Sequence, residues 1–150
     1  MFRGTHCHTL DSKGRLSVPA RFRDQLNALC DGQIVLTINP TNEAAERCLW
    51  AYPLPRWEEV ERQVADLPST QASTRRFQRL FIGHSEELRL DNQSRILLSA
   101  NLRQYAQIER DVVLVGQVGK FEIWDAELWQ QQQSLSLDED LLAGLGELRL

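Results

Sequence analysis

Hydrophobic and polar residues alternate over residues 5–10 and again over 15–19, a period of two that predicts a pair of β-strands. Between them stands DSKG at 11–14, which is typical of a tight turn because Asp accepts hydrogen bonds from nearby amides and Gly supplies a positive φ. Two further apolar runs, QIVLTI at 33–38 and CLWAYP at 48–53, predict strands on either side of a polar loop.

The period becomes that of a helix directly after the second strand. Phe22, Leu26 and Leu29 are spaced four and three residues apart, and Pro19 stands near the start of this stretch, where proline favours a helix. We therefore expect the unit to run strand, turn, strand, helix, strand, strand.

Nearly the same pattern returns eighty residues later. LDSKGRLSVPARFR begins at Leu10 and LDNQSRILLSANLR begins at Leu90, and the apolar positions repeat along with the charged ones. A hairpin unit of this size buries little by itself. We therefore expect an α+β fold, in which two such halves form one pseudo-symmetric small β-barrel with helices outside. The predicted boundaries are 1–53 for the first repeat, 54–80 for a helical linker, 81–130 for the second repeat and 131–150 for an acidic tail.

The linker predicts two helices. Trp57, Val60, Val64 and Leu67 form one helical stripe that Pro68 ends. A basic helix follows, with Phe77 and Leu80 apolar and Arg75, Arg76 and Arg79 polar. These arginines are either a patch that binds DNA, in addition to the basic N-terminal part described below, or a surface that pairs with another subunit. The acidic tail favours the second interpretation. The tail itself, with leucines and two glycines, is either a short docked helix or a mobile end.

Charge is distributed unevenly along the 150 residues, whose net charge is −4. The first 26 residues carry five cations and two acids, whereas the last 26 carry one arginine and six acids. Affinity for a polyanion depends on the local patch, so the N-terminal part is a candidate for binding nucleic acid. No apolar run approaches the roughly 20 residues of a membrane span, and the N-terminus lacks the apolar stretch of a signal peptide. We expect a cytoplasmic protein whose three cysteines are reduced.

Two interpretations of the first turn remain open. In one, Lys13 and Arg15 meet phosphates and guanine edges, Gly14 shapes the turn, and Asp11 orients Arg15. In the other, Asp11 and Arg15 are an ion pair that holds the hairpin, and the survival of Asp91 and Arg95 around the altered NQS favours this for the shared pair. Arg3 is a second candidate contact, and Arg95 and Arg89 are weaker ones.

Other chemistry finds little support. His6 and His8 share one face of the first strand, with Cys7 on the other, but no third metal ligand is evident, so contact with the DNA backbone is the better use of the histidines. Nucleophile, P-loop and metalloprotease motifs are missing, and neighbouring carboxylates do not converge. We expect no enzyme, metal, cofactor or small-molecule substrate, and we expect Trp57, Trp124 and Trp129 to be core or interface anchors.

Taken together, MFRG at the start, LDSKGRLSVPARFR, RRFQRLFIGHSEE, the second D-x-x-x-R and VGQVGKFEIWD near the end resemble the MraZ family of bacterial transcriptional regulators. The resemblance covers nearly the whole chain. By position, its paired D-x-x-x-R motifs are Asp11 with Arg15 and Asp91 with Arg95. The second copy departs from the family pattern: Ser94 replaces the usual turn glycine, and Ala100 takes the place of a proline often found near the helix start.

The resemblance implies tandem SpoVT–AbrB swapped-hairpin half-domains that form an intramolecular pseudo-dimer. It implies a ring-shaped homo-oligomer that binds G-rich direct repeats in double-stranded promoter DNA and represses its own division and cell-wall operon, in the cytoplasm at the nucleoid. Two alternatives stay open. One is an AbrB-like antitoxin, for which the C-terminal tail is short, and the other is a structural ring without a DNA role.

Overall fold

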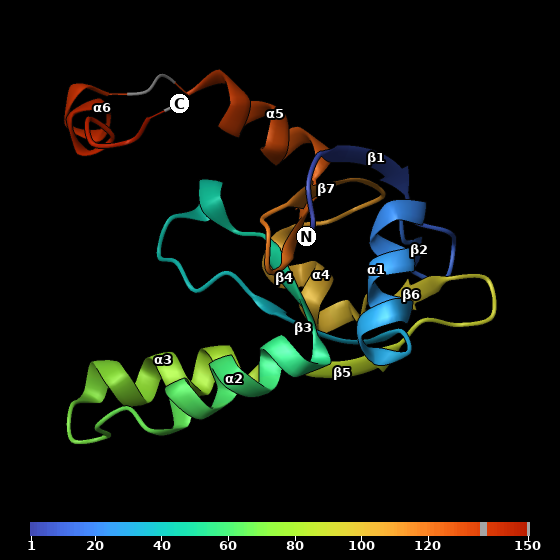
Figure 1. Cartoon of the computed structure of the whole chain (residues 1–150), viewed down its shortest axis with the longest axis horizontal. Helices are drawn as coiled ribbons and strands as arrows, with labels where there is room; N and C mark the ends of the chain where they lie inside the picture. Colours follow the sequence, from blue (N-terminus) through green and yellow to red (C-terminus); the bar gives the residue numbers. More distant parts are fainter. Residues whose placement is uncertain (136–137, 150) are drawn as a thin grey trace.

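The computed structural model describes residues 1–135 and 138–149 and shows an α+β fold built on antiparallel strands (Figure 1). The elements of the first half are β1 (Thr5–Thr9), β2 (Arg15–Ser17), α1 (Ala20–Cys30), β3 (Gln33–Ile38), the 3-10 turn η1 (Ala44–Glu46) and β4 (Leu49–Pro53). The helices α2 (Leu54–Ala65) and α3 (Ala72–Gly83) follow. The second half holds β5 (Glu86–Arg89), β6 (Arg95–Leu97), α4 (Ala100–Ala106), β7 (Asp111–Gly116), β8 (Phe121–Asp125), α5 (Ala126–Ser134) and α6 (Glu139–Gly144).

Each half has the predicted order of strand, turn, strand, helix, strand, strand, and the two halves exchange strands. β1 pairs with β7 of the second half, and β5 pairs with β3 of the first half. The short strands β2 and β6 pair with each other, as do β4 and β8. Exchanging the two halves maps each of these pairings onto another or onto itself, so the pairing pattern has twofold pseudo-symmetry.

The predicted closed barrel is not confirmed. In the described part of the chain, the backbone hydrogen bonds form a six-stranded sheet in the order β1-β7-β8-β4-β3-β5 and a separate two-stranded sheet of β2 and β6. β1 and β5 therefore remain the two edges of the larger sheet. We call the pair β2 and β6 the ribbon.

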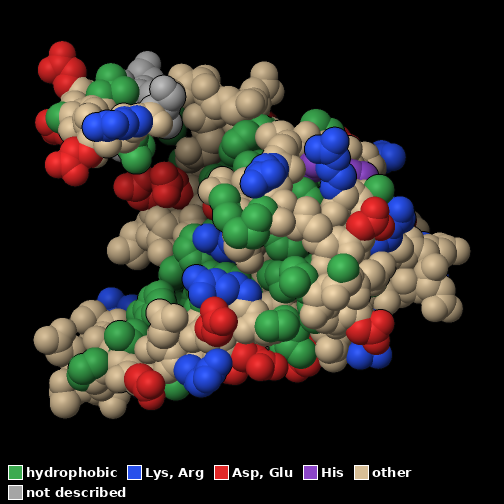
Figure 2. Space-filling view, viewed as in Figure 1, with side chains coloured by type: hydrophobic (Ala, Val, Ile, Leu, Met, Phe, Trp, Pro, Cys, Tyr) green, Lys and Arg blue, Asp and Glu red, His purple; other side chains and the backbone are tan. Residues whose placement is uncertain are grey.

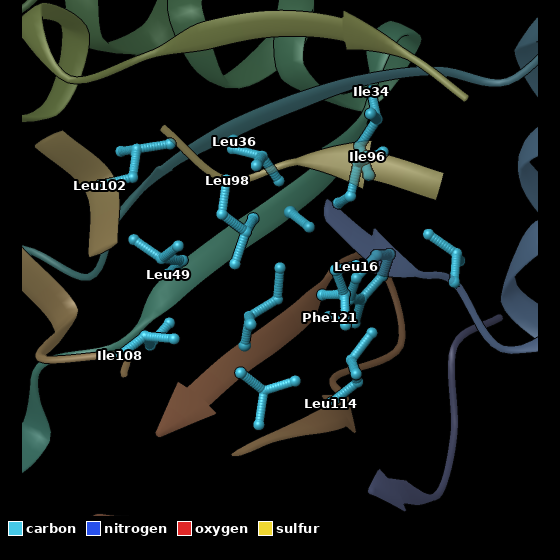
Figure 3. Close-up of a cluster of buried hydrophobic side chains, with 14 of the residues drawn as sticks. Leu16, Ile34, Leu36, Leu49, Ile96, Leu98, Leu102, Ile108, Leu114 and Phe121 are labelled. Carbon is cyan, nitrogen blue, oxygen red and sulfur yellow. The ribbon is translucent and has the colours of Figure 1, made fainter. Parts of the chain in front are cut away.

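The main core lies between the ribbon and the six-stranded sheet, with side chains from both halves pointing into it (Figure 3). Leu16 and Ile96 come from the ribbon, and Leu36, Leu114 and Phe121 come from the sheet; all five are at most 2 % exposed. Burying such a side chain contributes about 1.5–3 kcal/mol. The ribbon is thus fixed to the body through its inner face, which leaves its outer face to solvent.

β3 lacks the alternation of a half-exposed strand because both of its faces are covered. Ile34 and Leu36 belong to the main core, whereas Val35 packs in a second cluster under α2 and α3 with Trp57. On that side Thr37 donates its hydroxyl to the carbonyl of Phe81 at 2.6 Å. The two helices lie side by side along the lower edge of the molecule in Figure 1.

Three sequence predictions about helices need correction. α1 buries Phe22 and Leu26, but Leu29 is 62 % exposed because the core ends one turn earlier. α2 begins at Leu54 and ends at Ala65, so Leu67 lies beyond it and is 40 % exposed. In the tail, α6 is a helix of six residues, and it is not docked, because no described residue from 138 to 149 is buried.

The predicted role of the tryptophans is confirmed for the body of the protein. Trp57 packs in the cluster under α2 and α3, and Trp124 packs at 5.7 Å, ring centre to ring centre, against Trp129 of α5. Trp57 and Trp124 are no more than 5 % exposed. They anchor helices to the sheet, so base stacking is not their use.

Candidate nucleic-acid interface

The first turn is built around the carboxylate of Asp11. Its Oδ1 accepts hydrogen bonds from the backbone N–H of Lys13 and of Arg15, both at 2.9 Å, and its Oδ2 accepts one from Nε of Arg15 at 2.6 Å. The N–H of Gly14 donates to the carbonyl of Asp11 at 3.0 Å, which closes the turn. Gly14 is needed there because its φ is +82° and a Cβ would lie 3.2 Å from the carbonyl oxygen of Leu98.

The second turn has the same construction although it lacks the glycine. Asp91 accepts from the N–H groups of Gln93 and Arg95, both at 2.8 Å, and from Nε of Arg95 at 3.0 Å. Ser94 takes the left-handed conformation, with φ of +59°, and donates its N–H to the carbonyl of Asp91. The shared Asp and Arg therefore hold the hairpin in both halves.

The start of the helix after the second turn is also preserved by other means. The counterpart of Pro19 is Ser99, one residue before Ala100, and its hydroxyl accepts from the N–H of Leu102 at 3.2 Å. Ser99 thus caps the helix with a side-chain hydrogen bond, which a proline at this position cannot accept. Ser99 also donates to Glu86 at 2.6 Å, so it ties α4 to β5.

The ribbon presents the arginines of both turns on its outer face. Leu16 and Ile96 are paired neighbours that point inward, so Arg15 and Arg95, one residue away, point outward. The carboxylate of Asp11 also lies 3.8 Å from Nη1 of Arg95, so it contacts an arginine from each half. The Arg15 side chain is 33 % exposed and that of Arg95 is 23 % exposed. With Nε bound to Asp11, the outer edge of the Arg15 guanidinium can meet a planar acceptor pair, whereas Nη1 of Arg95 already lies near Asp11.

The hydrogen bonds to these carboxylates favour their charged forms. Those from the Arg15 and Lys13 backbone, together with the Arg15 side chain, lower the pKa of Asp11 from its ordinary value of 3.8 to about 2. The equivalent bonds, with the Arg95 backbone first, lower the pKa of Asp91. Both aspartates therefore stay ionised and hold their arginines in place at every pH at which the protein would meet DNA.

Replacing Asp11 by Asn is expected to lower the stability of the fold at pH values above about 4 and to leave it unchanged near pH 2. A lowered pKa in the folded state stabilises the fold above about pH 4, and this contribution disappears as pH falls from about 4 to about 2. Asp11→Asn should therefore unfold more easily than the wild type at neutral pH, and the two unfolding curves should converge near pH 2. Thermal unfolding at half-unit pH steps measures this. Asp24→Asn, an exposed carboxylate 3.9 Å from Arg23, is the control and should change the pH dependence less. A constant gap between Asp11→Asn and the wild type would contradict the expectation.

Cations gather around the first turn, and strand exchange brings two of them from the second half. Lys13 is exposed, and no acidic side chain of the described residues pairs with its ammonium group. Arg103 of α4 donates Nε to the carbonyl of Leu98 at 3.0 Å, and its guanidinium carbon would lie 3.3 Å from a Cβ on Gly14. Arg110 accepts the N–H of Leu10 on its carbonyl. A hollow of about 470 Å³ here is lined by Leu10, Asp11, Ser12, Arg103, Glu109 and Arg110.

Two of the three cations have uncharged counterparts at the second turn, whereas Arg103 has Arg23 as its counterpart in the repeat. Gln93 stands where the first turn has Lys13. The backbone N–H of Leu90 donates to the carbonyl of Gly32, and that of its counterpart Leu10 donates to the carbonyl of Arg110. A glycine therefore stands at the second turn where the first turn has an arginine. Arg103 and Arg110 were not among the residues that sequence reasoning selected. The pairing of Arg23 with Arg103 in the repeat pointed to one of them, but nothing in the sequence placed either beside the first turn.

Arg3 and Arg89 do not join the cations around the first turn. Arg3 precedes β1 and the turn follows it, so the five-residue strand separates them, at about 3.3 Å per residue. Arg89 ends β5, next to the second turn, and its Nη2 lies 3.8 Å from Asp31. A ligand bound at Lys13 would reach these residues only if it were extended, as a duplex is.

His6 and His8 share a face of β1 as predicted, and that face turns inward. The ring of His6 packs at 5.0 Å from that of Phe22, and its Nε2 is buried without a partner. Burial, followed by the charge of His6, lowers the pKa of His8. Contact of these histidines with a DNA backbone is therefore disfavoured. No group of three or more His, Cys, Asp or Glu that could hold a metal occurs in residues 1–135 and 138–149.

The two halves seen in the structure can be compared with what is known of similar proteins. A family described as "MraZ protein, putative antitoxin-like" matches the chain twice, over residues 1–80 and 81–144. The chain belongs to the MraZ family. Among its relatives, the transcriptional regulator MraZ of Acidithiobacillus ferrooxidans is 62 % identical over the full length of both chains.

Other MraZ relatives are similar over most of their length. The transcriptional regulator MraZ of Alkalilimnicola ehrlichii is 50 % identical, over 93 % of this chain and 90 % of its own. That of Pseudomonas aeruginosa is 44 % identical, over 91 % of this chain and 88 % of its own. MraZ proteins are thus named as regulators of transcription and not as enzymes. Within the described residues, no helix has the length and apolar character to cross a membrane.

Proposed function

We propose that this protein is a sequence-specific DNA-binding transcriptional regulator that reads promoter DNA through its first turn. The observation that carries the proposal is the contrast between two turns of one shape. The shared Asp and Arg account for the fold of both turns, whereas Lys13 and Arg110 at the first turn have the uncharged Gln93 and Gly32 as their counterparts at the second. The two turns have the same hydrogen bonds, so the additional cations of the first turn are not needed for its fold. We therefore assign these cations to the binding of a polyanionic ligand.

The chemistry of each cation suggests its contact. Arg15, oriented by Asp11 and facing outward on the ribbon, suits a bidentate contact with N7 and O6 of guanine. Lys13, Arg103 and Arg110 suit phosphates, which set affinity and register without reading sequence. Arg3, Arg95 and Arg89 are further contacts along the same duplex.

The finer parts of the proposal follow the family resemblance. The exchanged strands support two SpoVT–AbrB swapped-hairpin half-domains at 1–53 and 81–130, with a linker at 54–80 and an acidic tail at 131–150. We infer a ring-shaped homo-oligomer at the nucleoid, in the cytoplasm, that represses its own division and cell-wall operon. One protomer offers few cations, and several identical turns on one ring would raise avidity for G-rich direct repeats through effective concentration.

A gel shift on the chain's own upstream DNA, at stated salt, tests the proposal. The expected result is a shift that weakens as salt rises, because cations displace counterions from phosphates. The absence of a shift at low salt would contradict DNA binding. It would favour the antitoxin that the family description mentions, or a ring without a DNA role.

Moving one charge between the turns tests which turn binds. Lys13→Gln should weaken binding to all sequences about equally and lower the slope of log K against log salt by about 1. Gln93→Lys in the same chain restores the net charge, but it should not restore binding, because Gly32 stands at that turn in place of Arg110. The double variant matches the wild type in charge and composition, so it is its own control. Wild-type affinity in the double variant would show that only total charge matters.

A further inference from the structure

The C-terminal segment, residues 138–149, carries apolar and acidic side chains that are exposed in the described part of the chain. Leu142, Leu145 and Leu148 are 50 %, 38 % and 58 % exposed. Glu139 and Asp140 lie in the first turn of α6, and neither forms an ion pair within the described residues. Figure 2 shows this acidic and hydrophobic group, together with a basic side chain, at the end of an arm that stands away from the body. Leucines grouped in this way on a surface are typical of a contact with another protein.

α3 carries a face of the opposite kind. Arg76 and Arg79 are exposed and have no acidic partner in the described part of the chain. Beside them Leu80 is 40 % exposed and Phe77 is half-buried. A hollow of about 250 Å³, lined by Arg76, Phe77, Leu80 and Pro40 among others, runs between α3 and the loop after β3. We call Arg76, Phe77, Arg79 and Leu80 of α3 the α3 face.

The two surfaces are complementary in both respects that matter for docking. The segment offers acidic side chains and exposed leucines, and the α3 face offers guanidinium groups beside a partly apolar hollow. We propose that the C-terminal segment of one protomer docks on the α3 face of a second copy of this chain. The proposal rests on the self-association in the proposed function and names the surfaces that produce it.

Within one protomer, α6 and the α3 face lie apart from each other. Asp125 caps α5 by accepting from Glu127 and Leu128, and Gln132 donates to the carbonyl of Ala45 at 2.7 Å. Trp129 packs against Trp124 of the sheet. α5 is thus fixed to the sheet, and in Figure 1 α6 lies at the top of the view whereas α3 lies at the bottom. A second protomer can bring its α3 face to α6 without a change in the position of α6 on the first protomer.

A contact between two different surfaces sets the symmetry of the assembly. When segment and α3 face belong to neighbouring protomers, each protomer uses both surfaces once, so the contact runs head to tail. Such contacts generate a ring if the rotation closes and a filament if it does not, whereas a contact of a surface with itself stops at a dimer. The structure thus gives a physical reason for a ring.

Two variants with reversed charges test the docking when they are studied alone and mixed. Glu139→Lys with Asp140→Lys makes the segment basic, and Arg76→Glu with Arg79→Glu makes the α3 face acidic. Each variant alone then meets like charge, and its dissociation constant for self-association should rise about tenfold or more. In an equimolar mixture, each reversed surface meets its complement on the other variant. The mixture should therefore recover the wild-type mass, as measured by mass photometry at moderate salt.

Controls separate charge from folding and position. Glu58→Lys with Glu61→Lys changes the net charge as the segment variant does, but on exposed positions of α2, and should leave the mass unchanged. All variants should keep the wild-type unfolding temperature, since the reversed residues are exposed. Leu142→Ser with Leu145→Ser, which keeps every charge, should also weaken association.

The outcomes separate this proposal from DNA binding. Wild-type mass in either reversed variant, or a mixture that fails to recover it, would overturn the docking and would point to contact within one protomer. A wild type that stays monomeric overturns it as well. Loss of DNA shift in the α3 variant at unchanged mass would make the arginines DNA contacts instead. If assembly follows the expected pattern while the wild type shifts no DNA, the docking stands and the proposed function fails.

Discussion

Replacing Arg15 by Ala should reduce affinity for the operator by about 1–3 kcal/mol, or about 5-fold to 150-fold, and should relax the preference for guanine. Arg15 lies on the outer face of the ribbon, and Asp11 holds its Nε at 2.6 Å, so little side-chain freedom is lost when DNA binds. Competition gel shifts with operator and with guanine-substituted DNA measure both effects.

Arg95→Ala is the matched control for this prediction. Arg95 has the same position on the ribbon and the same bonds to its aspartate, so its loss should disturb the turn as much as the loss of Arg15. The second turn has Gln93 and Gly32 in place of Lys13 and Arg110, and the loss of Arg95 should therefore cost less affinity. Equal losses in the two variants would mean that the ribbon reads DNA with both halves. Unchanged affinity in Arg15→Ala would remove the first turn from the interface.

The turns could be predicted from the sequence because every contact in them is local. Asp11 reaches amides two and four residues away, which the spacing D-x-x-x-R specifies without reference to the rest of the chain. The repeat likewise predicted the order of elements in each half. The shape of the second turn was less accessible, since a serine there must adopt a conformation that glycine prefers, with φ of +59°.

The surroundings of the turns could not be predicted because they depend on strand exchange. Arg103 and Arg110 lie about ninety positions from the turn that they flank. Arg110 reaches it because β1 pairs with β7, and Arg103 reaches it because β2 pairs with β6 and Leu98 bonds to Gly14. A single sequence indicates that two halves exist but not which strand of one lies beside which strand of the other. The same limit applies to Leu29, whose spacing fits the core although the core ends before it.

Replacing Phe22 by Ala should lower the free energy of unfolding by about 3–5 kcal/mol, the largest stability effect that we expect from a single substitution. Phe22 is fully buried where the halves meet, with its ring 5.2 Å from that of Phe2 and 4.9 Å from that of Phe121. Its removal leaves a cavity between α1 and the sheet that rigid neighbours cannot fill. Urea unfolding followed by tryptophan fluorescence measures the change.

Leu29→Ala on the same helix is the control, because its side chain is 62 % exposed and should change stability by no more than about 0.5 kcal/mol. A loss of several kcal/mol there would mean that Leu29 is covered in solution, for example by a second copy. A loss under about 1 kcal/mol in Phe22→Ala would contradict the packing of the core. With both results as expected, β1 and the first turn owe their position to the aromatic cluster around Phe22, so Phe22→Ala should weaken DNA binding in proportion to the fraction unfolded.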